Sequence, residues 1–148
     1  MPSAQNSVTI NRPVGEVFAF LADAENDPKW RPGVKQIHRE GGAPGVGTIY
    51  RQKVSGPMGK TIDADVEITT FEPGRLIEFH AIAGPVRPRG SYVLESAGDG
   101  ATRVTFSLEA EVAGAMKLMK GKVQKTMDGE VGTLENLKRV LEGSGASA

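Results

Sequence analysis

The sequence predicts one α+β domain in which helices lie on one side of a curved antiparallel sheet. Apolar residues alternate with polar ones from about residue 34 to residue 109, in segments that short turns join. Short turns imply antiparallel pairing, because parallel strands need long crossover connections. An apolar stripe at helical spacing then occupies residues 115–141. The 148 residues contain no repeat or linker, so we expect a single domain with a core of its own.

The N-terminal part predicts one strand and two short helices. Residues 7–10 are short, β-branched and alternating, which favours a strand. Residues 16–22 continue an apolar face that includes Val17 and Leu21, which indicates a helix. Asp27-Pro28 interrupts this helix, and a second short helix or turn carries Trp30.

Six further strands are expected before the terminal helix. The clearest covers residues 61–71, where apolar positions such as Ile62 and Val66 alternate with acidic ones. Gly- and Pro-rich turns separate the strands. The six predicted ranges are 34–39, 48–54, 61–71, 76–83, 90–96 and 102–110. Together with the first strand they make a sheet of about seven strands.

The last segment predicts one long amphipathic helix over residues 115–141. At about 100° per residue, its apolar residues share an arc of roughly 120°, the width of a core-facing stripe. The stripe consists of Met116, Met119, Val123, Met127, Val131, Leu134, Leu137 and Leu141. We expect the domain core to span residues 7–141, with tails at 1–6 and 143–148.

Composition excludes several classes of function. The chain has 18 basic and 18 acidic residues, so it carries no net positive charge that would attract a polyanion. Nucleic-acid binding is therefore not expected. It has no cysteine, which excludes disulfides and thiolate metal sites. No apolar run is long enough to span a membrane, and residues 1–7 lack the apolar stretch of a signal peptide. We therefore expect a cytoplasmic monomer or homodimer.

Several segments carry a resemblance to a known family, in the right order and nearly end to end. They are residues 8–21, 27–30, 45–48, 71–75 and 100–106. The chain resembles the START/Bet v 1-like (SRPBCC) superfamily, particularly its polyketide cyclase/dehydrase-like branch. The resemblance implies a helix-grip fold, in which a seven-stranded curved antiparallel sheet wraps around a long C-terminal helix, with two short helices after the first strand. It also implies a cavity between sheet and helix, where members bind lipids, sterols, polyketides or plant metabolites.

The candidate ligand-binding residues are those expected to face this cavity. Methionines in the helix stripe can line irregular apolar space, although ordinary core packing explains them equally. Tyr50, Gln52 and Tyr92 fall on the inward phase of their strands, where they could orient a ligand or make structural hydrogen bonds. Trp30 could close the cavity or anchor the helix pair. The full set is Trp30, Tyr50, Gln52, Phe79, Arg89, Tyr92, Met116, Met119 and Val123.

The charged and histidine residues have structural explanations that are simpler than a role in a binding site. Arg89 lies in a Pro-rich loop region expected near a cavity mouth, where it could pair with a ligand anion or with Glu78 or Glu95. His38 and His80 are expected to be solvated strand residues. Asp63, Asp65 and Glu67 form a carboxylate row that we expect on a solvated face. No metal site, cofactor or catalytic motif is predicted.

Three functions remain open at this point. The favoured one is binding of a hydrophobic or amphipathic small molecule, such as a lipid, polyketide or aromatic metabolite. The first alternative is a polyketide cyclase/dehydrase-like enzyme, which would need an interior titratable group with a perturbed pKa that the sequence does not reveal. The second alternative is a protein-interaction module without a ligand.

Overall fold

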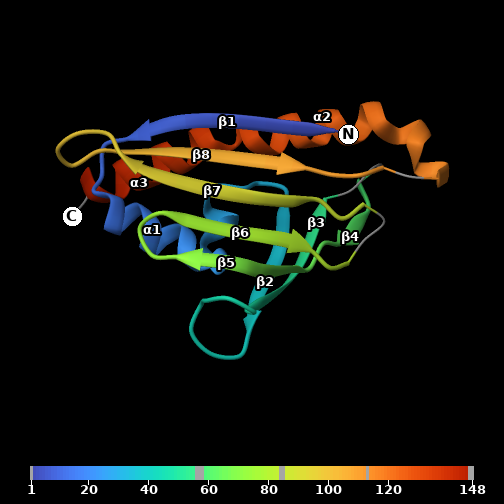
Figure 1. Ribbon diagram of the computed structural model, residues 1–148, viewed down its shortest axis with the longest axis horizontal. Helices are drawn as coiled ribbons and strands as arrows, with labels where there is room; N and C mark the ends of the chain where they lie inside the picture. The colour runs from blue at the N-terminus through green and yellow to red at the C-terminus, as the bar shows by residue number, and fades with distance from the viewer. Residues whose placement is uncertain (1, 56–58, 84–85, 113, 147–148) are drawn as a thin grey trace.

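The computed structural model describes residues 2–55, 59–83, 86–112 and 114–146. Figure 1 shows the chain from its N-terminal strand to its C-terminal helix. The elements are β1 (Ser3–Ile10), α1 (Val14–Ala22), η1 (Ala24–Lys29), β2 (Val34–Glu40), β3 (Ile49–Ser55), β4 (Thr61–Asp63), β5 (Val66–Glu72), β6 (Leu76–Ala81), β7 (Arg89–Ser96), β8 (Thr102–Glu109), η3 (Gly114–Met119), α2 (Lys120–Gly132) and α3 (Leu134–Ala146). The elements η1 and η3 are 3-10 helices.

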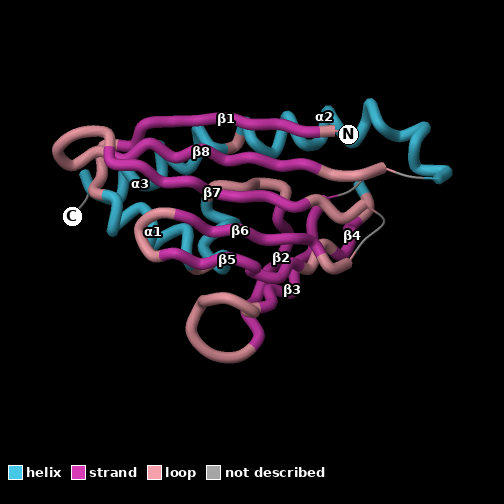
Figure 2. Tube along the Cα trace, viewed as in Figure 1, coloured by secondary structure: helices cyan, strands magenta, loops and turns pink. Residues whose placement is uncertain are grey.

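The strands form one antiparallel sheet with the order β1-β8-β7-β6-β5-β3-β2. The short β4 lies off this path and pairs with β3. Figure 2 shows the helices on one side of the sheet. The described chain thus has the predicted helix-grip architecture: a curled sheet of seven successive strands with the C-terminal helices packed against it.

The core fills the space between the inward face of the sheet and the helices. Ile10, Val104 and Phe106 face it from β1 and β8, while Leu134 and Leu137 face it from α3, and all five are at most 1% exposed. Burying one such side chain contributes about 1.5–3 kcal/mol. The apolar stripe predicted from helical periodicity therefore does pack in the concave face of the sheet.

Strand β1 begins at Ser3, four residues before the predicted start, so the expected tail at residues 1–6 is wrong. Its backbone pairs with β8 along the whole length, from Ser3 opposite Glu109 to Ile10 opposite Thr102. Gln124 of α2 also accepts from the Ser3 N–H and donates to the Ser3 carbonyl. The added residues are mostly polar, so alternation of apolar and polar residues did not predict this extension of the strand.

The predicted strand over residues 61–71 is divided into β4 and β5. At the interruption, the Ala64 N–H donates to the Gln52 carbonyl at 2.8 Å, and the Gln52 N–H donates to the Asp65 carboxylate at 2.9 Å. The Gln52 side-chain amide also donates to the Ala64 carbonyl at 2.9 Å. Side chains thus take over hydrogen bonds that a regular ladder would make, and the strand bends there.

The single helix predicted over residues 115–141 is also wrong in detail. The segment starts as η3 and divides into α2 and α3 at Thr133. The Thr133 N–H and hydroxyl both donate to the Glu130 carbonyl, which tightens the turn. Gly129, Gly132 and Thr133 all have low helix propensity, so the break falls where the helix is weakest. Helix α3 continues to Ala146, beyond the predicted end of the core.

Candidate functional site

Burial on the inward face of the sheet is uneven along the molecule. Near α1 and α3, side chains such as Val17 and Leu137 are fully buried. Near the start of α2, apolar side chains stay only partly buried although strand alternation or helix position directs them inward. They are Val54, Val66, Phe79, Met119 and Val123. Figure 1 shows that the start of β5, the end of β6 and the start of α2 lie at the same end of the molecule. These inward-facing side chains are therefore less completely covered by the rest of the protein than Val17 and Leu137 are.

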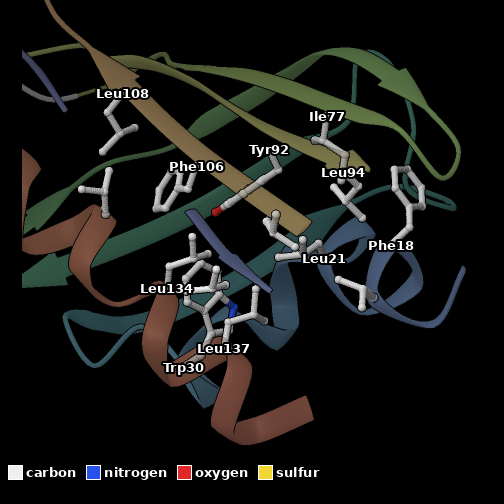
Figure 3. Packing of buried hydrophobic residues seen from close by; sticks show 14 of the residues in the cluster. Phe18, Leu21, Trp30, Ile77, Tyr92, Leu94, Phe106, Leu108, Leu134 and Leu137 are labelled. Atoms are coloured by element: carbon white, nitrogen blue, oxygen red, sulfur yellow. The ribbon is translucent and has the colours of Figure 1, made fainter. Parts of the chain in front are cut away.

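An aromatic cluster lies between this end and the fully buried core. Tyr92 packs against Phe106 with ring centroids 4.7 Å apart, and Trp30 lies edge-on to both rings at 6.1 and 6.2 Å. Phe79 extends the cluster toward the partly buried end, 5.7 Å from Tyr92. Figure 3 shows the Tyr92 hydroxyl pointing from the sheet toward the side where Leu134 and Trp30 lie. The cluster therefore presents two polar groups, the Tyr92 hydroxyl and the Trp30 indole N–H, to an otherwise apolar interior.

A buried polar cluster lies close to these rings, and it joins three parts of the fold. Arg31, just after η1, donates through Nη1 to Asp27 at 2.7 Å and to the Gln52 amide oxygen of β3 at 3.1 Å. Its Nε donates to Glu130 of α2. The side chains of Asp27, Arg31 and Glu130 are 7%, 15% and 26% exposed. We name Asp27, Arg31, Gln52 and Glu130 the Arg31 cluster.

Local structure brings Asp27 and Arg31 together. Both the Trp30 and the Arg31 N–H donate to the Asp27 carbonyl, so the chain turns tightly at the end of η1. This turn places two residues that are four apart on the same side. The indole nitrogen of the intervening Trp30 is buried and has no hydrogen bond of good geometry in the described chain. It is close enough to the Asp27 carboxylate to lower the pKa of that group slightly.

Burial has the largest effect on the pKa of Asp27 in this cluster. It raises the pKa of Asp27 from 3.8 to about 6, because the opposing attraction of Arg31 does not offset desolvation and Glu130 adds repulsion. Burial lowers the pKa of Arg31, but Glu130 and Asp27 outweigh this effect, so its pKa is raised. Burial also raises the pKa of Tyr92 well above 10, helped by the Asp27 charge. Tyr92 therefore stays a neutral phenol at physiological pH.

Comparison with known proteins identifies the family. The family model described as polyketide cyclase / dehydrase and lipid transport matches residues 1–142. The chain belongs to this polyketide cyclase/dehydrase family. No curated protein matches the chain at a significant level.

Solved structures agree with this family in fold. A protein from Thermus thermophilus superposes with a TM-score of 0.80 at 24% identity, covering 97% of this chain and 99% of the other. The Zhui aromatase/cyclase from Streptomyces sp. R1128 has a TM-score of 0.69 at 16% identity, covering 93% and 94%. A START superfamily protein from Mycobacterium smegmatis has a TM-score of 0.67 at 18% identity, covering 96% and 95%. At these identities the likeness establishes a shared START/Bet v 1-like fold.

Several predicted site residues of this family member meet at the aromatic and Arg31 clusters. Trp30, Tyr92 and Phe79 belong to the aromatic cluster, and Gln52 belongs to the Arg31 cluster. The carbonyl of Trp30 also accepts from Asn136 of α3 at 3.1 Å, and its side chain is buried. Trp30 thus joins the end of η1 to the sheet and to α3, and its two expected roles, closing the cavity or anchoring the helix pair, stay predictions.

Tyr50 and the helix residues lie at other positions. The fully buried Tyr50 donates to the Ala22 carbonyl at 3.3 Å, so it makes the structural hydrogen bond that was one of its two predicted roles. Met119 and Val123 are partly buried at the start of α2. Met116 lies in η3, and its side chain is outside the described part of the structure.

Arg89 is not brought to the interior. It lies on the outer face of β7, is 62% exposed, and donates from Nε to Glu109 at 2.6 Å. The expectation that it reaches a cavity mouth fails because alternation along β7 sends Arg89 outward when Tyr92 points inward. Its expected alternative partners, Glu78 and Glu95, are not the residues it contacts.

The outer face of the sheet is hollowed where β1, β8, β7, β6 and β5 lie side by side. This concave region measures about 690 Å³ and is lined mainly by polar side chains such as Gln5, Ser91 and Ser107. Two pairs of charged residues lie along it, Arg89 with Glu109 and His80 with Glu67 at 3.7 Å. Most of its lining side chains point outward, so this hollow lies on the opposite face of the sheet from the Arg31 cluster.

The remaining polar candidates form ion pairs across strands. Asp63 pairs with Lys53 at 2.6 Å, and Asp65 pairs with Arg51 at 2.9 Å. The carboxylate row is thus paired rather than merely solvated, and Asp65 is also partly buried. Within the described ranges, no group of three or more His, Cys, Asp or Glu residues could hold a metal ion. In the same ranges no helix is both long and apolar enough to cross a membrane.

Sequence reasoning missed Asp27, Arg31 and Glu130 as site residues. A signal for Glu130 was present, because at about 100° per residue it falls within the arc of the apolar stripe. A carboxylate at such a position needs a partner when it is buried. Asp27 and Arg31 carry opposite charges at a spacing of four, which is also a pairing signal. Nothing in the local sequence indicated that Glu130 and Asp27 both pair with the guanidinium of Arg31.

Proposed function

We propose that the chain binds a hydrophobic or amphipathic small molecule between the sheet and α2, at the end where inward-facing apolar side chains are least covered. The observation that carries this proposal is the uneven burial of inward-facing apolar residues. Phe79, Val66 and Val123 stay partly exposed beside a core of buried side chains. A ligand that covers these side chains would gain the apolar burial that the protein alone leaves incomplete.

The polar groups beside this space support an amphipathic ligand. Ligand pockets in proteins are mostly apolar, with a few polar groups that fix orientation. Here the Tyr92 hydroxyl and the Arg31 cluster supply such groups at the inner end of the apolar wall. The family description, which includes both polyketide cyclisation and lipid transport, agrees with a ligand of this kind.

Binding of the neutral fluorescent probe N-phenyl-1-naphthylamine tests the proposal. We expect a saturable rise in its emission on titration with the protein. Replacing Val123 by phenylalanine (V123F) should weaken binding at least fivefold, because the larger side chain occupies the proposed space. The matched variant T126F adds the same ring at an exposed position of α2 and should leave binding unchanged. Thermal unfolding verifies that both variants fold.

Absence of saturable probe binding by the folded wild-type protein would contradict the proposal. So would equal binding by wild-type protein and V123F, since the probe would then lie elsewhere. Native mass spectrometry of the purified protein provides an independent check, because a co-purified small molecule would appear as a mass above that of the chain.

A polyketide cyclase-like reaction is a second candidate, and one observation favours it. Asp27 is a buried carboxyl group with a pKa of about 6, beside Arg31 and near Tyr92. Groups with such shifted pKa values can exchange protons near neutral pH and cluster at active sites. This is the interior titratable group that an enzyme would need.

Turnover of a linear aromatic poly-β-ketone substrate, followed by chromatography, tests the second candidate. If Asp27 transfers a proton, the variant D27N should lose at least tenfold in kcat while the neutral probe still binds. The control D128N changes an exposed aspartate of α2 and should keep wild-type turnover. Absence of turnover by the wild-type protein would leave ligand binding as the function, whereas equal turnover by D27N would show that Asp27 does not transfer the proton. Location in the cytoplasm and a monomeric or homodimeric state stay predictions.

A further inference from the structure

We propose that the Arg31 cluster makes the interior site select ligands whose polar group is an uncharged hydroxyl, as in phenols, over ligands that present an ionised carboxylate. The inference rests on the proposed function, because it specifies the ligand class of the same site. The sequence-based expectation of an ion pair with a ligand anion concerned a different residue, Arg89, which lies on the outer face of the sheet.

Charge balance in the cluster is the first argument. The guanidinium of Arg31 already contacts the carboxylates of Asp27 and Glu130. One positive charge therefore faces two groups that can each carry a negative charge. Arg31 is the cation whose attraction lowers the pKa of both Asp27 and Tyr92, against the effects of burial and of Glu130. A ligand carboxylate would be a third anion at one cation, in a partly desolvated place where unpaired charge is costly.

The second argument comes from Tyr92, which is itself a phenol placed beside the cluster. Tyr92 is 6% exposed, and its hydroxyl makes no hydrogen bond within the described ranges. Burial and the charges of Asp27 and Glu130 act together to raise its pKa, which means that this position disfavours an anion. The same environment would disfavour a ligand anion next to the Tyr92 oxygen.

Hydrogen-bonding capacity gives the third argument. A hydroxyl both donates and accepts, whereas an ionised carboxylate only accepts. The cluster offers acceptors on Asp27 and Glu130, and Tyr92 offers a hydroxyl that can act in either direction. A ligand phenol can donate to a carboxylate oxygen and accept from Tyr92 at the same time. A ligand carboxylate can accept from Tyr92 or from the indole N–H of Trp30, unpartnered within the described residues, but it cannot donate to Asp27 or Glu130.

A matched ligand pair tests the inference. The ligands 2-naphthol and 2-naphthoate share one ring system, and at pH 7.5 the first is neutral and the second is ionised. Displacement of N-phenyl-1-naphthylamine measures both affinities. We expect the wild-type protein to bind 2-naphthol at least tenfold more tightly than 2-naphthoate.

Variants distinguish the effect of the Arg31 cluster on ligand preference from the general cost of placing an anion in an apolar space. Removing one negative charge with E130Q should reduce the preference for 2-naphthol at least threefold. D27N removes the other acidic group and should act in the same direction, which keeps the test valid if one variant folds poorly. The control E135Q makes the same change at an exposed position of α3 and should leave the preference unchanged.

Each result has a distinct meaning. If the probe binds and 2-naphthoate binds as tightly as 2-naphthol, the inference is overturned while the proposed function stands. If the preference persists unchanged in folded E130Q and D27N, the cluster does not set it, and the inference is also overturned. If neither the probe nor 2-naphthol binds, the proposed function fails, and the inference falls with it.

Discussion

Replacing Arg31 by methionine should lower the free energy of unfolding by about 3–5 kcal/mol at pH 7, because removing one partner of a buried ion pair leaves uncompensated charge. In the native protein Arg31 contacts both Asp27 and Glu130, and all three side chains are largely buried. Without the guanidinium, these two groups face each other in a desolvated place. Methionine keeps much of the apolar stem, so lost packing contributes little. Urea unfolding followed by far-UV circular dichroism measures the change.

The matched control is R89M, on the outer face of the sheet. Arg89 also pairs with a glutamate, but both partners are exposed, at 62% and 47% for Arg89 and Glu109. Exposed pairs contribute about 0–1 kcal/mol, so R89M should be close to the wild-type protein. The triple variant D27N/R31M/E130Q should recover at least half of the loss, because it removes the stranded carboxylates as well. Equal small effects of R31M and R89M would show that the Arg31 cluster is not a buried ion network.

The stability of the protein should fall by about 3 kcal/mol as pH rises from about 4 to about 6, through Asp27 alone. The pKa of this group is raised from 3.8 to about 6 by burial. Between these values the folded state holds a proton that the unfolded state has released, so folding is favoured at the lower pH. Above pH 6 both states are ionised, and the contribution has been lost. Unfolding in urea at several pH values measures the slope.

The difference between wild-type protein and D27N isolates this contribution. Asparagine does not titrate, so the decline over this window should be absent in the variant. Burial raises the pKa of Asp65, but hydrogen bonds and the charge of Arg51 outweigh burial, so its pKa is lowered. Side-chain and backbone hydrogen bonds lower the pKa of Glu142. These two groups increase stability as pH rises through the acidic range, which is opposite to the effect of Asp27. The pH dependence of the wild-type protein alone therefore does not isolate the contribution of Asp27. D128N should keep the wild-type slope, and parallel curves for wild-type protein and D27N would refute the assignment.

Periodicity in the sequence predicted most of the architecture. Alternation over residues 34–109 identified the antiparallel strands, and the helical stripe identified the C-terminal helices that pack on the sheet. The departures occur where side chains compete with backbone pairing. Gln52 and Asp65 divide one strand into β4 and β5, and Thr133 ends α2 by bonding to Glu130. Such local contacts leave the hydrophobic pattern unchanged, so periodicity could not reveal them.

The apolar part of the candidate site and the polar residues Tyr92 and Gln52 were predictable from the sequence, but the charged residues were not. Tyr92, Phe79 and Val123 follow from the inward phase of their elements, and the structure places them on that side. The Arg31 cluster joins residues that are far apart in the chain, since Arg31 and Glu130 are separated by 99 positions. Each charged residue alone resembles ordinary surface. Its burial results from how η1, β3 and α2 meet, which depends on the whole fold.

The indole of Trp30 gives the molecule a built-in optical reporter. The chain has one tryptophan, and that side chain lies against Tyr92, with its nitrogen near Asp27. Its ultraviolet emission therefore carries no background from a second indole elsewhere. Protonation of the neighbouring carboxyl group or arrival of a guest molecule would alter the electric field around this ring. Label-free spectroscopy on the unmodified chain can thus follow both events at the place where they occur.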